Sequence, residues 1–219
     1  MPSKAAELCD NILLSVPARL PTRYGSFRIH AFQCPATGED HVALVKGTIA
    51  RRENVLVRLH SECVTGDVFG SERCDCGAQL DAALKKIGRA PQGALLYLAQ
   101  EGRGIGIANK VAAYHLQDHG LDTVDANRVL GFPADMRSYK CAACVLRVLG
   151  VESIRLMTNN PAKIEALESY GVKVTSRIPL EVPATATSAR YLRTKRDRLH
   201  HLLQPPKEQD AQKRRPGTR

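Results

Sequence analysis

The order of strand-like and helix-like segments is the feature that most restricts how this 219-residue chain folds. Residues 26–34 alternate polar and apolar side chains, and residues 42–49 and 54–60 are rich in Val, Leu and Ile. These patterns predict three strands in succession. Beyond residue 77, helical and extended patterns alternate. Successive strands followed by such alternation predict a single α/β domain with a mixed β-sheet flanked by helices.

Apolar spacing and helix breakers place the elements of the alternating part. Leu80, Leu84 and Ile87 recur on one face of the first expected helix. Pro161 stands at the first position of another, where its missing N–H is tolerated. We expect the lead-in, residues 1–20, to be partly helical. The expected strands are 93–99, 153–158 and 172–178, and the expected helices are 77–87, 107–117, 140–149, 161–169 and 188–203.

The composition is that of a soluble globular protein. Hydrophobic residues make up 43% of the chain and charged residues 25%, and the length suffices for a sizeable core. No apolar run is long enough to span a bilayer. Residues 1–5 lack the charged-then-apolar pattern of an export signal. We therefore expect a cytoplasmic protein in which residues 1–203 form one domain.

The positive charge is unevenly distributed along the chain. The formal net charge is +10 at pH 7, and residues 185–219 carry ten Lys or Arg against three Asp or Glu. We assign this excess to a tail, and expect residues 204–219 to be basic, flexible and solvated. The chain has no Trp, and its basic residues are not interleaved with aromatic ones that would stack on bases. Dedicated nucleic-acid binding is therefore not expected.

Three cysteines, Cys63, Cys74 and Cys76, lie close together among polar residues. Three thiolates without an obvious fourth protein ligand favour a zinc ion with one position left for water, as in catalytic zinc sites. The alternatives are a disulfide or buried free thiols. A reducing compartment and the neighbouring charged residues favour metal. Cys141 and Cys144 have C-x-x-C spacing too, but on an expected helix we interpret them as packing residues.

Three charged loops offer places for a phosphate. Residues 100–103 end an expected strand, where open α/β sheets bind ligands. Residues 158–163 end a strand and open a helix, and Lys163 opposes the helix dipole unless it meets an anion. For both loops the alternative is an ordinary turn with solvated charges. Asp135 and Arg137 form either an exposed ion pair or a carboxylate that holds an arginine against a phosphate.

Taken together, five segments resemble the GTP cyclohydrolase II family. They are Arg58-Leu59-His60-Ser61-Glu62-Cys63, Cys74-Asp75-Cys76-Gly77, Gln100-Glu101-Gly102-Arg103, Leu130-Gly131-Phe132-Pro133-Ala134-Asp135-Met136-Arg137 and Thr158-Asn159-Asn160-Pro161. The resemblance runs from about residue 20 to residue 203, and the joint order of the segments is highly specific. It implies that residues 1–203 are a monofunctional catalytic domain, without the partner domain of bifunctional relatives that makes a dihydroxybutanone phosphate.

The resemblance also implies roles for individual residues. The zinc ligands would be Cys63, Cys74 and Cys76, and the catalytic residues would be Asp135 as proton acceptor, Arg137 as nucleophile toward the α-phosphate, and Tyr114. The nucleotide would contact Arg58, Leu59, His60, Ser61, Glu62, Gln79, Glu101, Gly102, Arg103, Thr123, Thr158 and Lys163. Because an arginine is protonated at neutral pH and is a poor nucleophile, we expect Arg137 to stabilise phosphoryl charge, with Asp135 orienting it.

The implied reaction is the first step of riboflavin biosynthesis. Zinc-dependent hydrolysis of GTP would open the guanine imidazole ring and release formate and pyrophosphate, leaving 2,5-diamino-6-ribosylamino-4(3H)-pyrimidinone 5′-phosphate. Carbon 8 of guanine lies between two nitrogens and is electrophilic enough for hydroxide delivered by a metal. Mg²⁺ would neutralise the β- and γ-phosphates, and Glu62 or Glu101 would accept hydrogen bonds from guanine N1–H and N2–H. The family also implies a homodimer.

Two other functions stay open. A paralogue in a specialised pathway would stop after ring opening and keep the formyl group, although the presence of Tyr114 argues against this. A non-enzymatic zinc-containing module would instead bind nucleic acid through the basic tail. Formate release and product mass separate the first alternative from the main hypothesis, and deletion of residues 205–219 tests the second.

Overall fold

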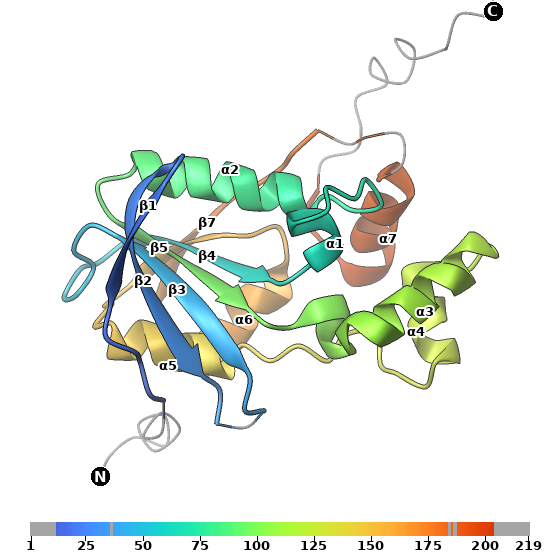
Figure 1. Cartoon of the computed structure of the whole chain (residues 1–219), viewed down its shortest axis with the longest axis horizontal. Coiled ribbons are helices and arrows are strands. Elements are labelled where there is room, and N and C mark those ends of the chain that lie inside the picture. Colours follow the sequence, from blue (N-terminus) through green and yellow to red (C-terminus); the bar gives the residue numbers. More distant parts are fainter. Residues whose placement is uncertain (1–11, 36, 184, 186–187, 204–219) are drawn as a thin grey trace, which may run out of the picture.

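The structure, a computed structural model, describes residues 12–35, 37–183, 185 and 188–203. Its centre is a seven-stranded sheet with the order β1-β2-β3-β5-β4-β6-β7 (Figure 1). The strands are β1 (Ala18–Thr22), β2 (Gly25–Gln33), β3 (Asp40–Lys46), β4 (Val55–Ser61), β5 (Gly93–Leu98), β6 (Ile154–Met157) and β7 (Val174–Ile178). The helices are α1 (Val64–Asp67), α2 (Cys76–Arg89), the 3₁₀ helix η1 (Glu101–Gly104), α3 (Gly106–Asp118), α4 (Thr123–Val129), α5 (Lys140–Val148), α6 (Pro161–Ser169) and α7 (Ala189–Leu199).

The sheet is mixed, which confirms the predicted α/β class. The neighbours β1, β2, β3 and β5 pair antiparallel, whereas β5, β4, β6 and β7 pair parallel. Every parallel strand is separated from the next along the chain by at least one helix. This is the connection that parallel pairing requires, since the chain must return to the starting edge of the sheet.

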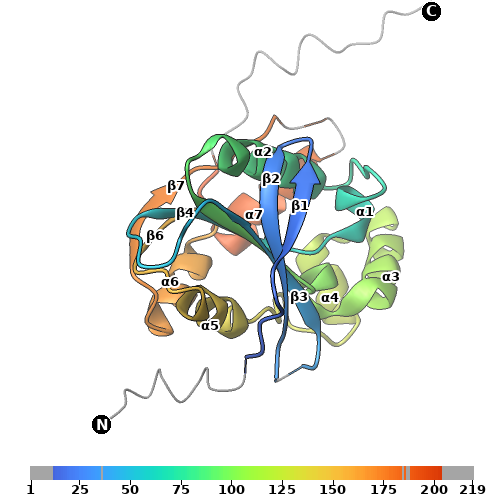
Figure 2. The same ribbon diagram turned by 60° about the vertical axis from the view of Figure 1, so that its left-hand side comes forward.

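Helices cover both faces of the sheet (Figures 1 and 2). On one face, α2 packs Ala83 and Ile87 against Phe27, Leu56 and Leu95. The opposite face carries α5 and α6, and its core includes Val55, Val57, Leu59, Ala142, Ala143, Val145, Leu146 and Leu167. Both faces of the parallel strands are therefore buried, as parallel sheets require.

Alternate side chains of β4 point to opposite faces of the sheet. Val55, Val57 and Leu59 belong to the core beneath α5 and α6. Because successive side chains of a strand point to opposite faces, Arg58 and His60 lie on the α2 side. Both are buried although they are polar. The strand thus carries two polar groups under α2 near the carboxyl end of the sheet.

The remaining helices gather beyond the carboxyl ends of the parallel strands. Figure 1 shows α1, α3, α4 and α7 together at that end of the molecule. The chain leaves β4 into α1 and leaves β5 into η1 and α3, and a short loop joins β6 to α6. Ligands of open α/β sheets bind outside these strand ends, so this end of the molecule is where a site is expected.

Several local predictions were wrong or incomplete. The end of the lead-in expected to be partly helical, residues 18–20, belongs to strand β1 (Ala18–Thr22), because this segment pairs with β2; residues 1–11 lie outside the described residues. The short helices α1 and α4 were not predicted, since four and seven residues leave too little apolar periodicity. The predicted tail, residues 204–219, lies outside the described residues. None of the described helices is both long and apolar enough to cross a lipid bilayer.

A disulfide joins Cys34, just after β2, to Cys141 in the first turn of α5. The interpretation of Cys141 as a packing thiol was therefore wrong. The two cysteines are 107 residues apart in sequence, and only the packing of the β2–β3 hairpin beside α5 brings them together. No local pattern announces such a contact.

Candidate active site

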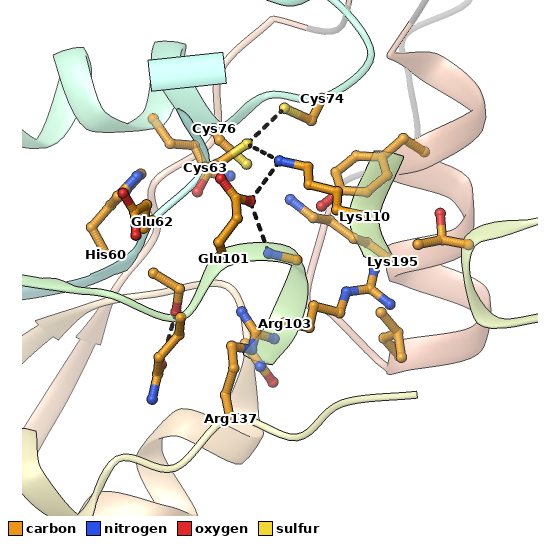
Figure 3. Close-up of a pocket in the computed structure, with 18 of the residues that line it drawn as sticks. His60, Glu62, Cys63, Cys74, Cys76, Glu101, Arg103, Lys110, Arg137 and Lys195 are labelled. Atoms are coloured by element: carbon orange, nitrogen blue, oxygen red, sulfur yellow. Dashed lines mark hydrogen bonds and ion pairs between the residues drawn. The ribbon is translucent and has the colours of Figure 1, made fainter. Parts of the chain in front are cut away.

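A pocket with an empty volume of about 1110 Å³, its open mouth included, lies beyond the strand ends (Figure 3). Segments that follow β4, β5 and β6 form its walls together with α2, α3, α4 and α7. All predicted site residues line this pocket except Leu59 and Asp135. Those that line it are Arg58, His60, Ser61, Glu62, Cys63, Cys74, Cys76, Gln79, Glu101, Gly102, Arg103, Tyr114, Thr123, Arg137, Thr158 and Lys163.

Arg58 is held at the end of β4 by two neighbours. Its NH1 donates to the Met157 carbonyl at 3.0 Å, and its NH2 donates to Gln79 Oε1 at 2.6 Å. Burial lowers the pKa of Arg58, and the Asp75 carboxylate opposes that shift. The buried Nε has no hydrogen-bond partner among the described residues. The guanidinium therefore keeps one donor for an acceptor that enters the pocket.

His60 belongs to a buried network centred on Asp67. The Asp67 carboxylate lies 3.0 Å from His60 Nε2 and accepts hydrogen bonds from Tyr97 Oη at 2.9 Å and from the Cys63 backbone N–H at 3.0 Å. Burial lowers the pKa of His60, which favours the neutral ring at pH 7. With its Nε2 proton donated to Asp67, the ring presents Nδ1 as an acceptor, and Nδ1 has no partner in the described part of the chain.

The three predicted metal ligands meet in the pocket wall. Their sulfur atoms all lie within 4.8 Å of one another, and Cys63 Sγ is 3.6 Å from Cys74 Sγ. A tetrahedral zinc with Zn–S bonds of about 2.3 Å requires sulfurs about 3.8 Å apart, so the cluster fits such an ion. No fourth His, Cys, Asp or Glu of the described residues joins this group.

Local packing shapes the cysteine cluster. A Cβ atom at Gly66 would lie 3.0 Å from Cys74 Sγ, and one at Gly77 would lie 2.2 Å from the Gly66 carbonyl oxygen. Glycine at both positions lets the α1 turn approach the start of α2 closely. Hydrogen bonds from Cys74 and Cys76 lower the pKa of Cys63, while the same contact raises the pKa of Cys74 to about 11.

Lys110 of α3 links this cluster to Glu101. Its Nζ lies 3.1 Å from Cys63 Sγ, 3.0 Å from Thr65 Oγ1 and 2.7 Å from Glu101 Oε1 (Figure 3). Glu101 also accepts hydrogen bonds from the backbone N–H groups of Val64 at 2.6 Å and Gly102 at 2.8 Å. Three donors from the chain itself therefore occupy the Glu101 carboxylate.

The loop after β5 and the loop before α5 are joined around Arg103. Its carbonyl accepts a hydrogen bond from the Met136 backbone N–H at 3.1 Å. Its backbone is left-handed, with φ +65°, and it follows Gly102 with φ +62°. Its NH1 contacts the Ala134 carbonyl at 3.4 Å, whereas its NH2 is buried with no partner among the described residues. Arg103 thus offers the pocket a second free donor.

Asp135 and Arg137 form a two-pronged ion pair. Arg137 Nε donates to Asp135 Oδ1 at 2.9 Å, and NH2 donates to Oδ2 at 2.5 Å. The Arg137 side chain is 13% exposed and lines the pocket, whereas that of Asp135 is 34% exposed and does not. Burial alone would raise the pKa of Asp135, but Arg137 outweighs it and the net pKa is lowered. The pKa of Arg137 is raised, because Tyr139 and Asp135 overcome the effect of burial.

The loop after β6 brings Lys163 into the wall. Asn160 caps α6 through the Ala162 backbone N–H at 3.0 Å, and Pro161 opens the helix as predicted. Lys163 is buried, and its Nζ donates to the Leu59 carbonyl at 2.8 Å. Burial lowers the pKa of Lys163, and the nearby cation Arg58 adds to this effect. A negative ligand would therefore stabilise its charged form.

Tyr114 faces the cysteines from α3. Its hydroxyl lies 3.2 Å from Thr65 Oγ1, and the Arg73 guanidinium stacks over its ring at 4.8 Å. Thr123 lines the opposite part of the wall at the first residue of α4, which Asp122 caps through the Val124 backbone N–H at 2.7 Å. These two helices place a phenol and a hydroxyl group on the same cavity.

The matches to known proteins agree with this geometry. The family model for GTP cyclohydrolase II matches residues 14–179. This chain belongs to the GTP cyclohydrolase II family. It is 53% identical to the GTP cyclohydrolase-2 of Tolumonas auensis over 89% of its own length and 98% of that protein. It is 55% identical to the riboflavin biosynthesis protein RibBA of Endomicrobium trichonymphae and 54% identical to that of Bacillus mycoides, over 84% and 86% of its length.

The chain spans about half the length of the RibBA relatives, 46% and 47% of those two. Among solved structures it aligns with RibBX of A. baumannii, a two-domain 3,4-dihydroxy-2-butanone 4-phosphate synthase, at 19% identity and a TM-score of 0.45. That alignment covers 82% of this chain and 43% of the other. Similarity at that level carries no argument about function.

Sequence reasoning missed several polar residues that line this pocket. Lys110 was absent from the prediction because a lysine in the middle of a helix has no distinguishing pattern. Tyr191, Lys195 and His201 line the pocket from α7 and the residues after it. The basic excess had been assigned to a tail, but half of its ten Lys and Arg residues belong to α7. That assignment was wrong in this respect, because a helix with one inward basic residue looks like a charged run.

Proposed function

We propose that the protein is a metal-dependent GTP cyclohydrolase that opens the guanine imidazole ring of GTP and releases formate and pyrophosphate. The product would be 2,5-diamino-6-ribosylamino-4(3H)-pyrimidinone 5′-phosphate, as in the first step of riboflavin biosynthesis. One observation carries the proposal: a single pocket holds a three-cysteine cluster together with the cations of Arg58, Arg103, Arg137 and Lys163. Such a pocket suits a substrate with a polyanionic end and a ring that must be attacked.

The cations are suited to phosphate because their hydrogen bonds are incomplete. Arg58 Nε and Arg103 NH2 are buried donors without partners among the described residues. A buried unpaired donor costs about 1–3 kcal/mol, and a phosphate oxygen would remove that cost while neutralising charge. Burial lowers the pKa of Lys163, and such an anion would raise it again. We assign the triphosphate to this side of the pocket, with Mg²⁺ as its counter-ion.

The cysteine cluster would hold zinc, which supplies activated water when bound. The residues around it position the ring. Asp67 fixes the Cys63 backbone and the His60 ring at once, and Tyr114 stands beside the cluster through Thr65. The burial of these groups excludes bulk water from one side of the ring.

Glu62 is the better candidate for reading guanine. The carboxylate of Glu101 already accepts three hydrogen bonds from the chain. That of Glu62 lines the pocket and accepts none from the described residues. Burial raises the pKa of Glu62, and Glu101 adds to the shift, so donors from the guanine N1–H and N2–H edge would stabilise its ionised form.

Arg137 would act as a charge stabiliser rather than a nucleophile. Its raised pKa keeps the guanidinium protonated, without a free electron pair to attack phosphorus. Its partner Asp135 has a lowered pKa and is therefore a weak proton acceptor, but its hydrogen bonds orient the Arg137 guanidinium. A covalent guanylyl adduct on Arg137, detected by mass spectrometry, would overturn this assignment.

The proposal is tested with purified protein, GTP and Mg²⁺, with and without a zinc chelator. We expect formate, pyrophosphate and the diamino product in a chelator-sensitive reaction. A product heavier by a formyl group, without formate, would instead identify the specialised paralogue. No turnover of GTP at all would refute the proposed activity, and RNA binding lost on deletion of residues 205–219 would favour the zinc-containing nucleic-acid module.

A separate variant tests the proposed recognition of guanine by Glu62. Glu62→Gln should lower kcat/KM for GTP about 10–100-fold, since a hydrogen bond to a charged group contributes about 1.5–3 kcal/mol. Glu165→Gln, at an exposed position of α6, is the matched control. An unchanged kcat/KM in Glu62→Gln would exclude Glu62. The homodimer that the family resemblance implies and the cytoplasmic location expected from the sequence stay part of the proposal, and sedimentation of the purified protein tests the former.

A further inference from the structure

Helix α7 lies outside residues 14–179, which the family model matches, yet it closes one side of the pocket. Tyr191 and Lys195 line the pocket from this helix, and Lys195 is labelled in Figure 3. The Lys195 side chain is only 10% exposed, although the helix is rich in charged residues. A buried lysine is costly unless it is paired and hydrogen-bonded, so its partner deserves identification.

That partner is Asp75, between the second and third cysteines of the cluster. Lys195 Nζ lies 2.5 Å from Asp75 Oδ1. Asp75 is the N-cap residue of α2, but its side chain caps no backbone N–H of the helix, unlike aspartate at most helix starts. Its carboxylate is directed instead to Lys195 and to the Gln79 side chain, which donates to Oδ2. Asp75 thus forms an ion pair with α7 instead of capping its own helix.

The same contacts continue to β4. Gln79 donates through Nε2 to Asp75 and accepts through Oε1 from Arg58 NH2 at 2.6 Å. Because an amide has one donor end and one acceptor end, the charge on Asp75 fixes which way Gln79 faces. Lys195, Asp75, Gln79 and Arg58 therefore form one buried chain of hydrogen bonds across α7, α2 and β4.

Among the described contacts of α7, the ion pairs of Arg198 lie at the surface. Arg198 pairs with Asp122 at 2.6 Å and with Asp125 at 3.1 Å, and its side chain is 39% exposed. Exposed pairs contribute little to stability. Just after the helix, the Leu202 backbone N–H donates to the Asn159 carbonyl at 2.8 Å. These contacts attach α7 and the residues after it without involving Lys195.

We propose that Lys195 is a positioning residue for both halves of the site: through Asp75 it holds the Cys74–Cys76 loop in its metal-binding shape, and through Gln79 it orients Arg58 toward the substrate phosphates. The role of Lys195 in orienting Arg58 rests on the proposed function, whereas its role in holding the Cys74–Cys76 loop does not. A second ring of hydrogen bonds around metal ligands commonly controls metal affinity. Here that ring is completed by a helix from the far end of the chain.

The test compares Lys195→Met, Lys195→Arg and the control Arg198→Ala, an exposed cation on the same helix. Methionine keeps the length of the side chain and removes the charge. Zinc affinity is measured by competition with a chromophoric chelator, and the absorption spectrum of the Co²⁺-loaded protein reports the geometry of the thiolates. Circular dichroism confirms that each variant is folded. Steady-state kinetics with GTP separate KM from kcat.

We expect Lys195→Met to weaken zinc binding about 10–100-fold, the usual effect of losing an outer partner of a metal site. Its Co²⁺ spectrum should shift and its KM for GTP should rise. Lys195→Arg should recover most of the affinity, and Arg198→Ala should match the wild type. A folded Lys195→Met protein with wild-type zinc affinity and Co²⁺ spectrum would overturn the proposal.

A second pair of variants covers the case in which Lys195→Met does not fold. Asp75→Asn combined with Lys195→Met removes both charges and leaves no unpaired ion. If Lys195 acts through Asp75, this double variant binds zinc as Asp75→Asn alone does. Independent, additive losses would refute the coupling. Zinc affinity needs no turnover, so an inactive wild type would refute the proposed function and leave this test intact.

Discussion

Lys110→Met should lower the free energy of unfolding more than the substitution of any exposed lysine does. Lys110 is 8% exposed, and its ammonium group lies 2.7 Å from Glu101 Oε1. In an effective dielectric of about 20, a pair at that distance has a Coulomb energy on the order of 6 kcal/mol. Desolvation cancels much of this, and removing one partner of a buried pair costs about 3–5 kcal/mol.

The lower end of that range applies here. Glu101 keeps its hydrogen bonds from the backbone N–H groups of Val64 and Gly102 after Lys110 is lost. We therefore expect a loss of about 3 kcal/mol in the free energy of unfolding. For a chain of this size that corresponds to a fall in Tm of roughly 6–12 °C.

The assay is urea unfolding followed by circular dichroism, with Lys85→Met as the control. Lys85 is 57% exposed and pairs with Asp81 on α2, so its loss should cost less than about 1 kcal/mol. A loss below about 1 kcal/mol in Lys110→Met would refute the reasoning.

Three further predictions address the site and the fold. Gly66→Ala should weaken zinc binding about tenfold or more in chelator competition, because its Cβ would lie 3.0 Å from Cys74 Sγ and ligand distances tolerate only about 0.2 Å; unchanged affinity would show that the cluster can shift. His201 is half-buried, and desolvation together with the nearby cation Lys195 lowers its pKa to about 3, against about 6.5 in the unfolded chain. Stability should therefore rise with pH between these values. His201→Asn should flatten that rise in denaturation curves, and an identical profile would contradict the assignment. The Cys34–Cys141 disulfide should contribute about 4.7 kcal/mol of unfolding free energy, given the 107-residue separation; under oxidising conditions a Cys34→Ser variant should be less stable by about this amount, and an unchanged stability would contradict this prediction.

The predicted parts of the site are residues that come directly after strands in the sequence. Glu62, Glu101 and Thr158 each come just after a buried strand, and parallel pairing brings those ends to one edge of the sheet. Apolar runs locate buried strands well, so these residues could be placed together without a structure.

The missed parts depend on contacts between distant residues. Lys195 meets Asp75 across 120 residues, and nothing near either one marks the pair. The sequence shows a basic helix, and only its packing on α4 turns one lysine inward. The choice between Glu62 and Glu101 likewise needed the backbone donors around Glu101, which no spacing rule supplies.

The alternation of core and pocket side chains along β4 determines how this protein tolerates insertions and deletions. Leu59 fills the core, while its neighbours Arg58 and His60 face the pocket. Inserting or deleting one residue ahead of this strand would exchange the two rows, burying a guanidinium in hydrocarbon and turning leucine toward the ligand. Point substitutions in this segment can be absorbed one at a time, whereas a change in its length would abolish folding and chemistry together.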